Sequence, residues 1–301
     1  SLVGSEMCIR DRSMRKVYFY LPDFYVNFHL ITTLDDMMKK SPELFFDDIK
    51  IGAAYGCFPG SIWNGGRVVL GSCTKQDMQY AISELNDRDI AVRYTFTNPL
   101  LEKHHLLDTF CNLCMELGDN GKNEVLVNSP VLEGFIRKTY TGYAILSSTT
   151  KCISDVEGIQ RELEKDYALV VLDSAMNNTE ELFALQHKEK IELIANHYCQ
   201  DNCPKRKAHY DAVGRCQLEF SEVDFPDCGN INRDFFQIMK NSSFITTDAI
   251  FGKYRKAGFV NFKLDGRGFN KYKVLESFLY YLVKPEHRDE MRLYLLRKLY
   301  K

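Results

Sequence analysis

This sequence of 301 residues has almost no excess of either charge, no long apolar run and a single tryptophan. Lys and Arg number 39 and Asp and Glu number 41, and the resulting net charge of −2 excludes a global basic field for nucleic acid. No stretch of about 18 uncharged apolar residues occurs, so we predict no transmembrane helix. The nucleotide signatures G-x-x-x-x-G-K-[ST] and G-x-G-x-x-G are missing, as are a Ser-His-Asp arrangement and H-E-x-x-H.

Cysteine, by contrast, is abundant, with ten residues. The first residues lack the apolar region of a secretion signal, so we expect a reducing, cytoplasmic compartment. There, clustered cysteines hold metal or do chemistry more often than they form disulfides. Residues 1–13, SLVGSEMCIRDRS, resemble translated sequencing-adapter sequence, and the natural start would then be Met14; a real but disordered leader is the alternative. We predict a single domain over residues 14–301.

The remaining chain alternates between short β-branched or aromatic runs and helical patterns. One helical pattern places Met78, Ile82 and Leu85 on one face, and another begins with Ser129 as N-cap and Pro130 at its first position. Eight strands separated by helices predict an α/β fold, a (β/α)8 TIM-like barrel with C-terminal helices; an open doubly wound sheet is the alternative. The predicted strands are 16–22, 49–56, 90–98, 123–129, 143–149, 167–174, 190–198 and 259–267.

In such a barrel the active site lies in the loops after the C-terminal ends of the strands. The loop after the second strand, GCFPGSIWNGGR, contains glycines that let the backbone approach a ligand, an aromatic face in Trp63, and polar groups in Asn64 and Arg67. Asn98, at the end of the third strand, is a candidate for orienting a substrate or for capping a turn. The alternative for the loop is a tight turn around a packing aromatic.

The eighth strand places three charged residues on one face. Lys263, Asp265 and Arg267 alternate along the segment FKLDGRGF, so their side chains share a side of the strand. We expect them to point into the barrel mouth and to bind an anionic group. Pairing among themselves, as a purely structural set of ions, is the alternative.

Four cysteines follow the seventh strand, in a segment from residue 199 to about residue 231 in which we find no helical stripe. A loop of about 30 residues without structure of its own is uncommon unless it is functional or held by another group. Four thiolates complete the shell of an iron–sulfur cluster or of zinc, and nearby basic residues favour the thiolate. The C-x₃-C spacing favours a [4Fe-4S] cluster over zinc; four reduced thiols are the alternative. The predicted ligands are Cys199, Cys203, Cys216 and Cys228.

Several of these segments resemble the collagenase-like peptidase family of unknown catalytic type, also called family thirty-two. The similar stretches are IELIANHYCQDNCPKRKAHY and GFVNFKLDGRGF, and NEVLVNSPVLEGFIRKTY followed by YAILSSTT resembles the family's middle strands. The resemblance is distant, spans most of residues 49–283, and implies a (β/α)8-like barrel with, in many members, a [4Fe-4S] cluster. Several members resemble oxygen-independent hydroxylation enzymes that act on RNA bases or quinone precursors. The family usually spaces its first two cluster cysteines further apart than Cys199 and Cys203.

Three functional hypotheses follow. The first is an iron–sulfur-dependent modification enzyme that hydroxylates an RNA base or a small aromatic substrate, with a small anionic substrate or co-substrate in the barrel mouth. The second is a peptidase or hydrolase of the same family, although no protease nucleophile and base are recognisable. The third is a non-enzymatic, zinc-stabilised binding subunit. RNA and a paralogous subunit are the further partners considered, because the basic segment KRK and the basic tail could touch either.

Overall fold

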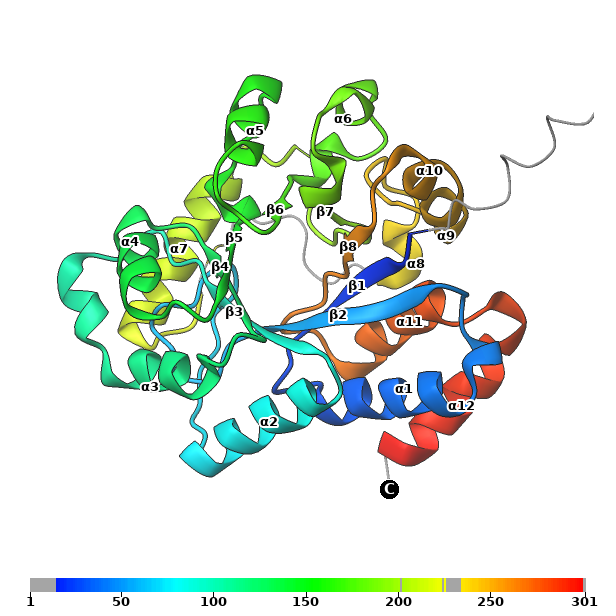
Figure 1. Ribbon diagram of the computed structural model, residues 1–301, viewed down its shortest axis with the longest axis horizontal. Helices are drawn as coiled ribbons and strands as arrows, with labels where there is room; N and C mark the ends of the chain where they lie inside the picture. Colours follow the sequence, from blue (N-terminus) through cyan, green and yellow to red (C-terminus); the bar gives the residue numbers. More distant parts are fainter. Residues whose placement is uncertain (1–14, 201, 224, 226–233, 300–301) are drawn as a thin grey trace, which may run out of the picture.

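Eight parallel strands close into one barrel in the computed structural model (Figure 1), which describes residues 15–200, 202–223, 225 and 234–299. Each strand pairs with the next, and β8 pairs back with β1, so the predicted barrel is confirmed and the open sheet is not. The predicted leader, residues 1–13, lies outside the described residues. The strands are β1 Val17–Pro22, β2 Ile49–Gly56, β3 Ala91–Phe96, β4 Glu124–Val127, β5 Ala144–Ser147, β6 Val170–Val171, β7 Ile191–Ile194 and β8 Asn261–Lys263.

Helices surround the barrel and follow its strands (Figure 1). The predicted helix with Met78, Ile82 and Leu85 forms as α2, and all three side chains are buried. Ser129 caps the next predicted helix, with Pro130 as its first residue. The helices are α1 Phe28–Lys40, α2 Lys75–Asp87, α3 Thr109–Gly118, α4 Pro130–Thr139, α5 Val156–Leu163, α6 Glu180–Ala184, α7 Arg206–Glu219, α8 Phe235–Ile238, α9 Thr247–Ala249, α10 Arg255–Ala257, α11 Lys271–Leu282 and α12 Arg288–Leu299.

Two layers of side chains fill the molecule. The main hydrophobic core lies between the strands and the surrounding helices, and it includes Phe278 and Tyr281 of α11. A small apolar cluster, made by Leu126, Leu146, Val171 and Ile194, is separate from it. These four residues belong to consecutive strands and alternate with residues of the main core, so they face the barrel interior. In the described residues no helix is long and apolar enough to cross a membrane.

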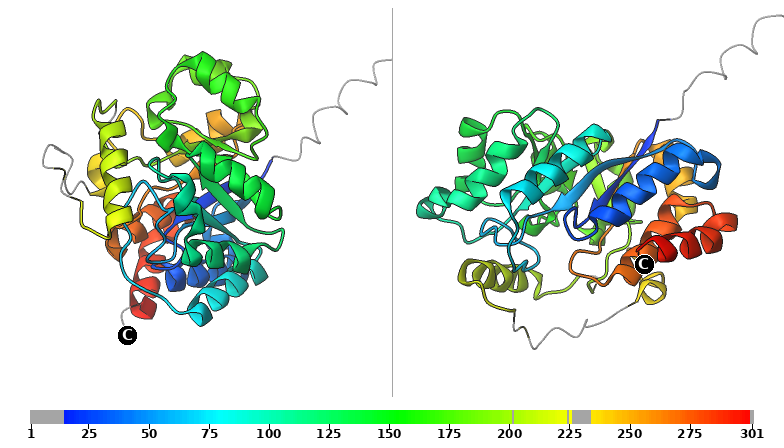
Figure 2. Two further views of the ribbon diagram at one scale, coloured as in Figure 1. Left: turned by 90° about the vertical axis from the view of Figure 1, so that its left-hand side faces the viewer. Right: turned by 90° about the horizontal axis from the view of Figure 1, so that it is seen from below.

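The segment after β7 differs from the prediction of a long irregular loop. Residues 206–219 form the helix α7, and Figure 2 shows it outside the ring of helices, below the body of the barrel. Its buried residues are Arg206, Val213, Gly214 and Gln217, so its inner face is mostly polar and gives no apolar stripe in the sequence. The helix is fixed by contacts with the loops after β2 and β3 rather than by a hydrophobic face. Gln217 accepts a hydrogen bond from the backbone N–H of Val69, and Asn98 donates to the carbonyl of Gly214.

Candidate functional site

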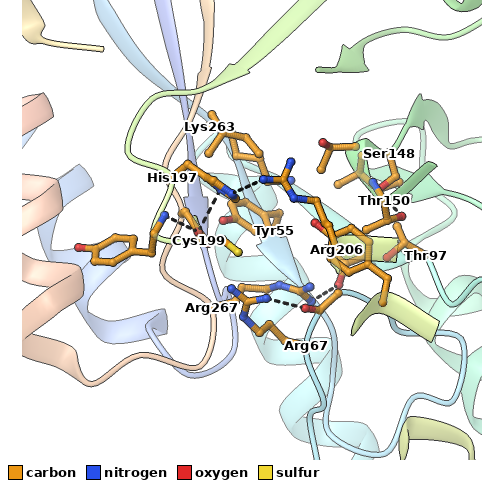
Figure 3. A pocket seen from close by; sticks show the side chains of 18 of the residues that line it. Tyr55, Arg67, Thr97, Ser148, Thr150, His197, Cys199, Arg206, Lys263 and Arg267 are labelled. Carbon is orange, nitrogen blue, oxygen red and sulfur yellow. Dashed lines mark hydrogen bonds and ion pairs between the residues drawn. The ribbon is translucent and has the colours of Figure 1, made fainter. Parts of the chain in front are cut away.

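A cavity of about 220 Å³ opens at the C-terminal ends of the strands, where the barrel fold predicts a site. Figure 3 shows its polar side chains converging from several strand ends and from α7. Of the described residues that line it, five are Lys or Arg and one, Asp265, is a carboxylic acid. The cavity is therefore cationic. Its charged and histidine lining residues are Arg67, His197, Arg206, His209, Lys263, Asp265, Arg267 and Lys273.

Two glycines let the loop after β2 lie directly on the end of β3. A Cβ atom on Gly65 would come within 2.5 Å of the backbone of Thr97, and Gly65 N–H donates to the carbonyl of Thr95. Gly66 has a φ of +76°, and a Cβ there would lie 2.8 Å from Nη2 of Arg267. The glycines thus allow a close approach to the protein's own backbone, whereas their predicted approach to a ligand stays a prediction, and Arg67 follows them into the cavity lining.

Arg267 is a buried guanidinium held by neutral oxygens. Its Nη1 donates to Asn64 Oδ1 at 2.9 Å and to Thr95 Oγ1 at 2.7 Å, and its Nη2 donates to the carbonyl of Gly65 at 2.6 Å. Among the described residues, no carboxylate lies within ion-pair distance of it. The charge of Arg267 acts on Asp23 over a longer distance: burial raises the pKa of Asp23, and Arg267 opposes that rise. The positive charge of Arg267 is thus fixed in position without a direct counter-ion.

Arg67 lies beside Arg267 (Figure 3) and donates from Nη1 to the carbonyl of Gly66 at 2.8 Å. The two guanidinium groups therefore bind the neighbouring carbonyls of Gly65 and Gly66. Burial acts to raise the pKa of Asp265, but the Arg67 guanidinium and the backbone N–H groups of Tyr198 and Gly266 outweigh it and hold that pKa below its usual range. Asp265 is therefore an anion at neutral pH, and the pair of arginines retains an excess of positive charge.

His197 lies between Asp265 and Arg206 on the loop after β7. Its Nδ1 is 3.8 Å from Asp265 Oδ2, and its Nε2 is 3.4 Å from Nη2 of Arg206. Burial lowers the pKa of His197, and Arg206 adds to this effect while Asp265 opposes it. Arg206 also pairs with Asp173, which neutralises much of its charge. The imidazole is therefore neutral, with Nε2 facing the Arg206 donor and Nδ1 facing Asp265.

Three of the seven residues predicted to contact substrate lie away from the cavity surface. Trp63 is fully buried, donates from Nε1 to the carbonyl of His105, and packs edge-on against Phe96. Asn98 is fully buried and holds α7 by its bond to Gly214. Asn64 does not line the cavity but accepts from Arg267. The other four line the cavity together: Arg67, Lys263, Asp265 and Arg267.

The four predicted metal ligands are placed unequally. Cys199 lines the cavity, and Cys203 follows it closely enough to affect its ionisation. Cys216 lies on α7, about 15 Å along the helix from its first residue, so the structure does not bring it to that pair. Cys228 lies outside the described residues. Within the part of the chain that the structure describes, no three His, Cys, Asp or Glu side chains form a group that fits a metal ion.

The ionisation of Cys199 also differs from the expectation that basic neighbours favour a thiolate. Burial raises the pKa of the Cys199 thiol, and the opposing charges of Arg206 and Arg67 do not cancel that effect. Lys205 and Lys207, counted as neighbours from the sequence, are exposed. In the described residues this site supplies two thiols, which is half of the predicted shell and does not complete the coordination of a cluster.

His197 and Arg206 are cavity residues that strand alternation alone does not reveal. His197 follows the end of β7, and this position at a strand end is the available sequence signal. Arg206 sits in the basic run KRK, where its two neighbours are exposed and it alone is buried. Arg206 is buried because it forms a salt bridge with Asp173, which follows β6. This contact depends on the packing of α7 and is not visible in the sequence.

The fold and the cavity define a (β/α)8-barrel protein with a cationic site at the C-terminal ends of its strands. Its structure is similar to the solved structure of the U32 peptidase Mk0906, with a TM-score of 0.54 and 15% sequence identity. The match covers 85% of this chain and 95% of that one. No protein-family model and no curated protein matches the chain. The likeness concerns the fold, and at that level it confirms the distant resemblance to family thirty-two.

Proposed function

We propose that this protein is an enzyme that binds a small carboxylate- or phosphate-bearing substrate in the mouth of its barrel. The observation that carries the proposal is the Arg267 guanidinium, buried and bound to three neutral oxygens in a cationic cavity. Burying a charge without a counter-ion is unfavourable, so a fixed guanidinium facing a cavity favours an anionic ligand. Arg67, which lines the same cavity, supplies the second donor group.

The test is a binding measurement with simple anions. Calorimetry with lactate, succinate, phosphate and a sugar phosphate should detect binding of at least one of them to the wild type. Arg267→Gln should weaken that binding by about 30-fold or more, since removing one partner of a buried charge pair costs about 2–5 kcal/mol. Arg267→Lys keeps the charge but loses the fork of donors, so an intermediate loss is expected.

Arg161→Gln is the matched control, because its guanidinium is exposed on α5 and pairs weakly with Glu157 at 3.7 Å. That variant should bind anions like the wild type. Unfolding temperatures of all variants separate lost binding from lost structure. If no anion binds, or if a folded Arg267→Gln binds as well as the wild type, the proposal is wrong. Cleavage of a peptide library that requires Arg67 and Asp265 would instead favour the hydrolase alternative.

An iron–sulfur-dependent modification enzyme remains the second candidate. The observation in its favour is that Cys199 lines the anion cavity and Cys203 lies in the same short loop. A bound cluster would supply electrons to a substrate in that cavity. Iron and sulfide analysis after anaerobic reconstitution tests it: Cys199→Ser with Cys203→Ser should lose both elements, whereas Cys73→Ser, remote from the cavity lining, should keep them. An iron-free wild type would exclude a cluster and leave the anion site intact.

A further inference from the structure

Lys263 is a buried primary amine at the base of the cationic cavity. It ends β8 and pairs in register with Tyr20 of β1 and Ile194 of β7, so it occupies the barrel wall near its centre. Its side chain is about one-tenth exposed, and that exposed part faces the cavity. Nζ lies 3.9 Å from the centre of the Tyr55 ring. Figure 3 shows the side chain directed to the same space as His197 and Arg206.

The amine has few contacts for a buried lysine. Among the described residues, Nζ donates no hydrogen bond, and its nearest carboxylate oxygen is Glu192 Oε1 at 3.9 Å. The other oxygen of Glu192 accepts from Arg93 at 2.6 Å. A lysine kept as the counter-ion of Glu192 would be expected to bind it directly, as Arg93 does. The position of Lys263 therefore fits an amine reserved for a ligand better than a structural ion pair.

The environment also keeps a large part of this amine unprotonated at neutral pH. Burial lowers the pKa of Lys263 to about 7, with Arg93 and Arg267 adding to the effect and Glu192 and Asp265 opposing it. An ordinary lysine, with a pKa near 10.4, is almost fully protonated at that pH and is a poor nucleophile. Desolvation next to other cations is a known way to make a lysine amine reactive toward carbonyl groups.

We propose that Lys263 forms an imine with the carbonyl carbon of a 2-oxo acid whose carboxylate is bound by Arg67 and Arg267. This inference rests on the proposed function, since it uses the same anion site. A 2-oxo acid carries a carbonyl next to its carboxylate, so one small molecule engages both the guanidinium pair and the amine that line this cavity. The volume of about 220 Å³ suits a compact substrate of this kind.

The reaction balances without an oxidant or a reductant. The neutral amine attacks the carbonyl carbon, a C–N bond forms as the C–O π bond breaks, and one of the two amine protons moves from nitrogen to oxygen to give a carbinolamine. The C–O bond then breaks, the hydroxyl leaves as water with the second amine proton, and a C=N bond remains. Glu192 Oε1, which has no hydrogen-bond partner among the described residues, is placed to take the proton that the ammonium group must release.

Borohydride trapping tests the inference. The wild-type protein is incubated with pyruvate, 2-oxobutyrate or 2-oxoglutarate, reduced, digested and mapped by mass spectrometry. We expect a reduced adduct on Lys263 with at least one of these acids and none with lactate, which lacks the carbonyl. Lys263→Arg, which keeps the positive charge, should still bind lactate or pyruvate in calorimetry but should lose the adduct.

Lys253→Met is the matched control, because Nζ of Lys253 also lies 3.9 Å from a ring centre, that of Phe183, but Lys253 is not part of the cavity lining. It should keep the adduct on Lys263. An adduct on Lys273, or no adduct in a wild type that binds these acids, overturns the imine and leaves the anion site standing. If neither lactate nor the oxo acids nor any other simple anion binds, the proposed function falls together with the imine.

Discussion

At the scale of the residue, the ionisation of Lys263 has a consequence for stability that does not depend on any substrate. The folded protein holds the pKa of this amine at about 7, mainly by burial, whereas the unfolded chain exposes an ordinary lysine. Below pH 7 both states are protonated, and the folded state carries the full penalty of a buried ammonium group. Between pH 7 and 10 the unfolded state binds the additional proton, so stability rises with pH in that window.

We therefore predict that Lys263→Met is more stable than the wild type at pH 7 and that this advantage shrinks as the pH is raised. Between pH 7 and 9 the wild type should gain roughly 2 kcal/mol relative to the variant, because a proton bound only by the unfolded state changes the free energy of unfolding by about 1.4 kcal/mol for each step of one in pH. Urea unfolding at several pH values measures it. A stability difference between Lys263→Met and the wild type that does not change with pH would contradict the prediction.

The sequence indicates that Lys263, Asp265 and Arg267 belong together but not the contacts that decide the roles of the loop residues. All three line the cavity, although β8 ends at Lys263, so Asp265 and Arg267 reach the cavity from the loop after the strand and not by the predicted strand alternation. The sequence predicts that Trp63 offers its face to a ligand, yet its ring is buried against Phe96. Arg67 of the same loop lines the cavity instead. The composition of the loop after β2 identifies it as a candidate site. The path of its backbone in three dimensions decides which of its side chains lines the cavity.

At the scale of the element, α7 shows why one helix escapes a sequence pattern. The strands are recognisable because β-branched and aromatic residues follow one another, and the predicted β2 range matches the strand Ile49–Gly56. The helix Arg206–Glu219 instead buries Arg206, Gly214 and Gln217 against polar groups of other loops. A helix held by hydrogen bonds rather than by an apolar stripe has no periodic signal to detect.

The close packing of α7 leads to a prediction about Gly214. A Cβ atom there would lie 2.5 Å from Asn98 Oδ1 and 3.1 Å from Pro99 Cδ, so Gly214→Ala must push the helix from its place. Gly134, inside α4, has nothing within 4 Å of its built Cβ. We predict that Gly134→Ala stabilises the protein by about 0.5–1 kcal/mol, as helix propensity requires. Gly214→Ala should destabilise it by about 1–3 kcal/mol.

Urea unfolding of both variants checks the signs, and anion binding checks the consequence for function. Because α7 carries Arg206 and His209 to the cavity, Gly214→Ala should also weaken anion binding, whereas Gly134→Ala should not. If the two alanine variants change stability in the same direction, the proposed docking of α7 is wrong.

At the scale of the whole molecule, the barrel buries a chain of charges beneath its cavity. Arg93 of β3 is fully buried and bridges Glu124 of β4 and Glu192 of β7 at 2.6 Å each, with its guanidinium 3.9 Å from the Tyr20 ring centre. Lys263 continues the chain toward the mouth. The eight-stranded closure was predictable from the number of strands, but this ion set was not, because it joins strands that are distant along the sequence.

The last prediction concerns Arg93, whose removal should affect the whole barrel. Arg93→Met leaves Glu192 fully buried with Lys263 as its remaining partner at 3.9 Å, and we expect a loss of about 3–5 kcal/mol in the free energy of unfolding at pH 7. Chemical unfolding at pH 7 measures the loss. Arg161→Met, which removes an exposed guanidinium, should change stability by less than about 0.5 kcal/mol. A loss for Arg93→Met as small as that for Arg161→Met would show that the interior charges do not hold the barrel closed.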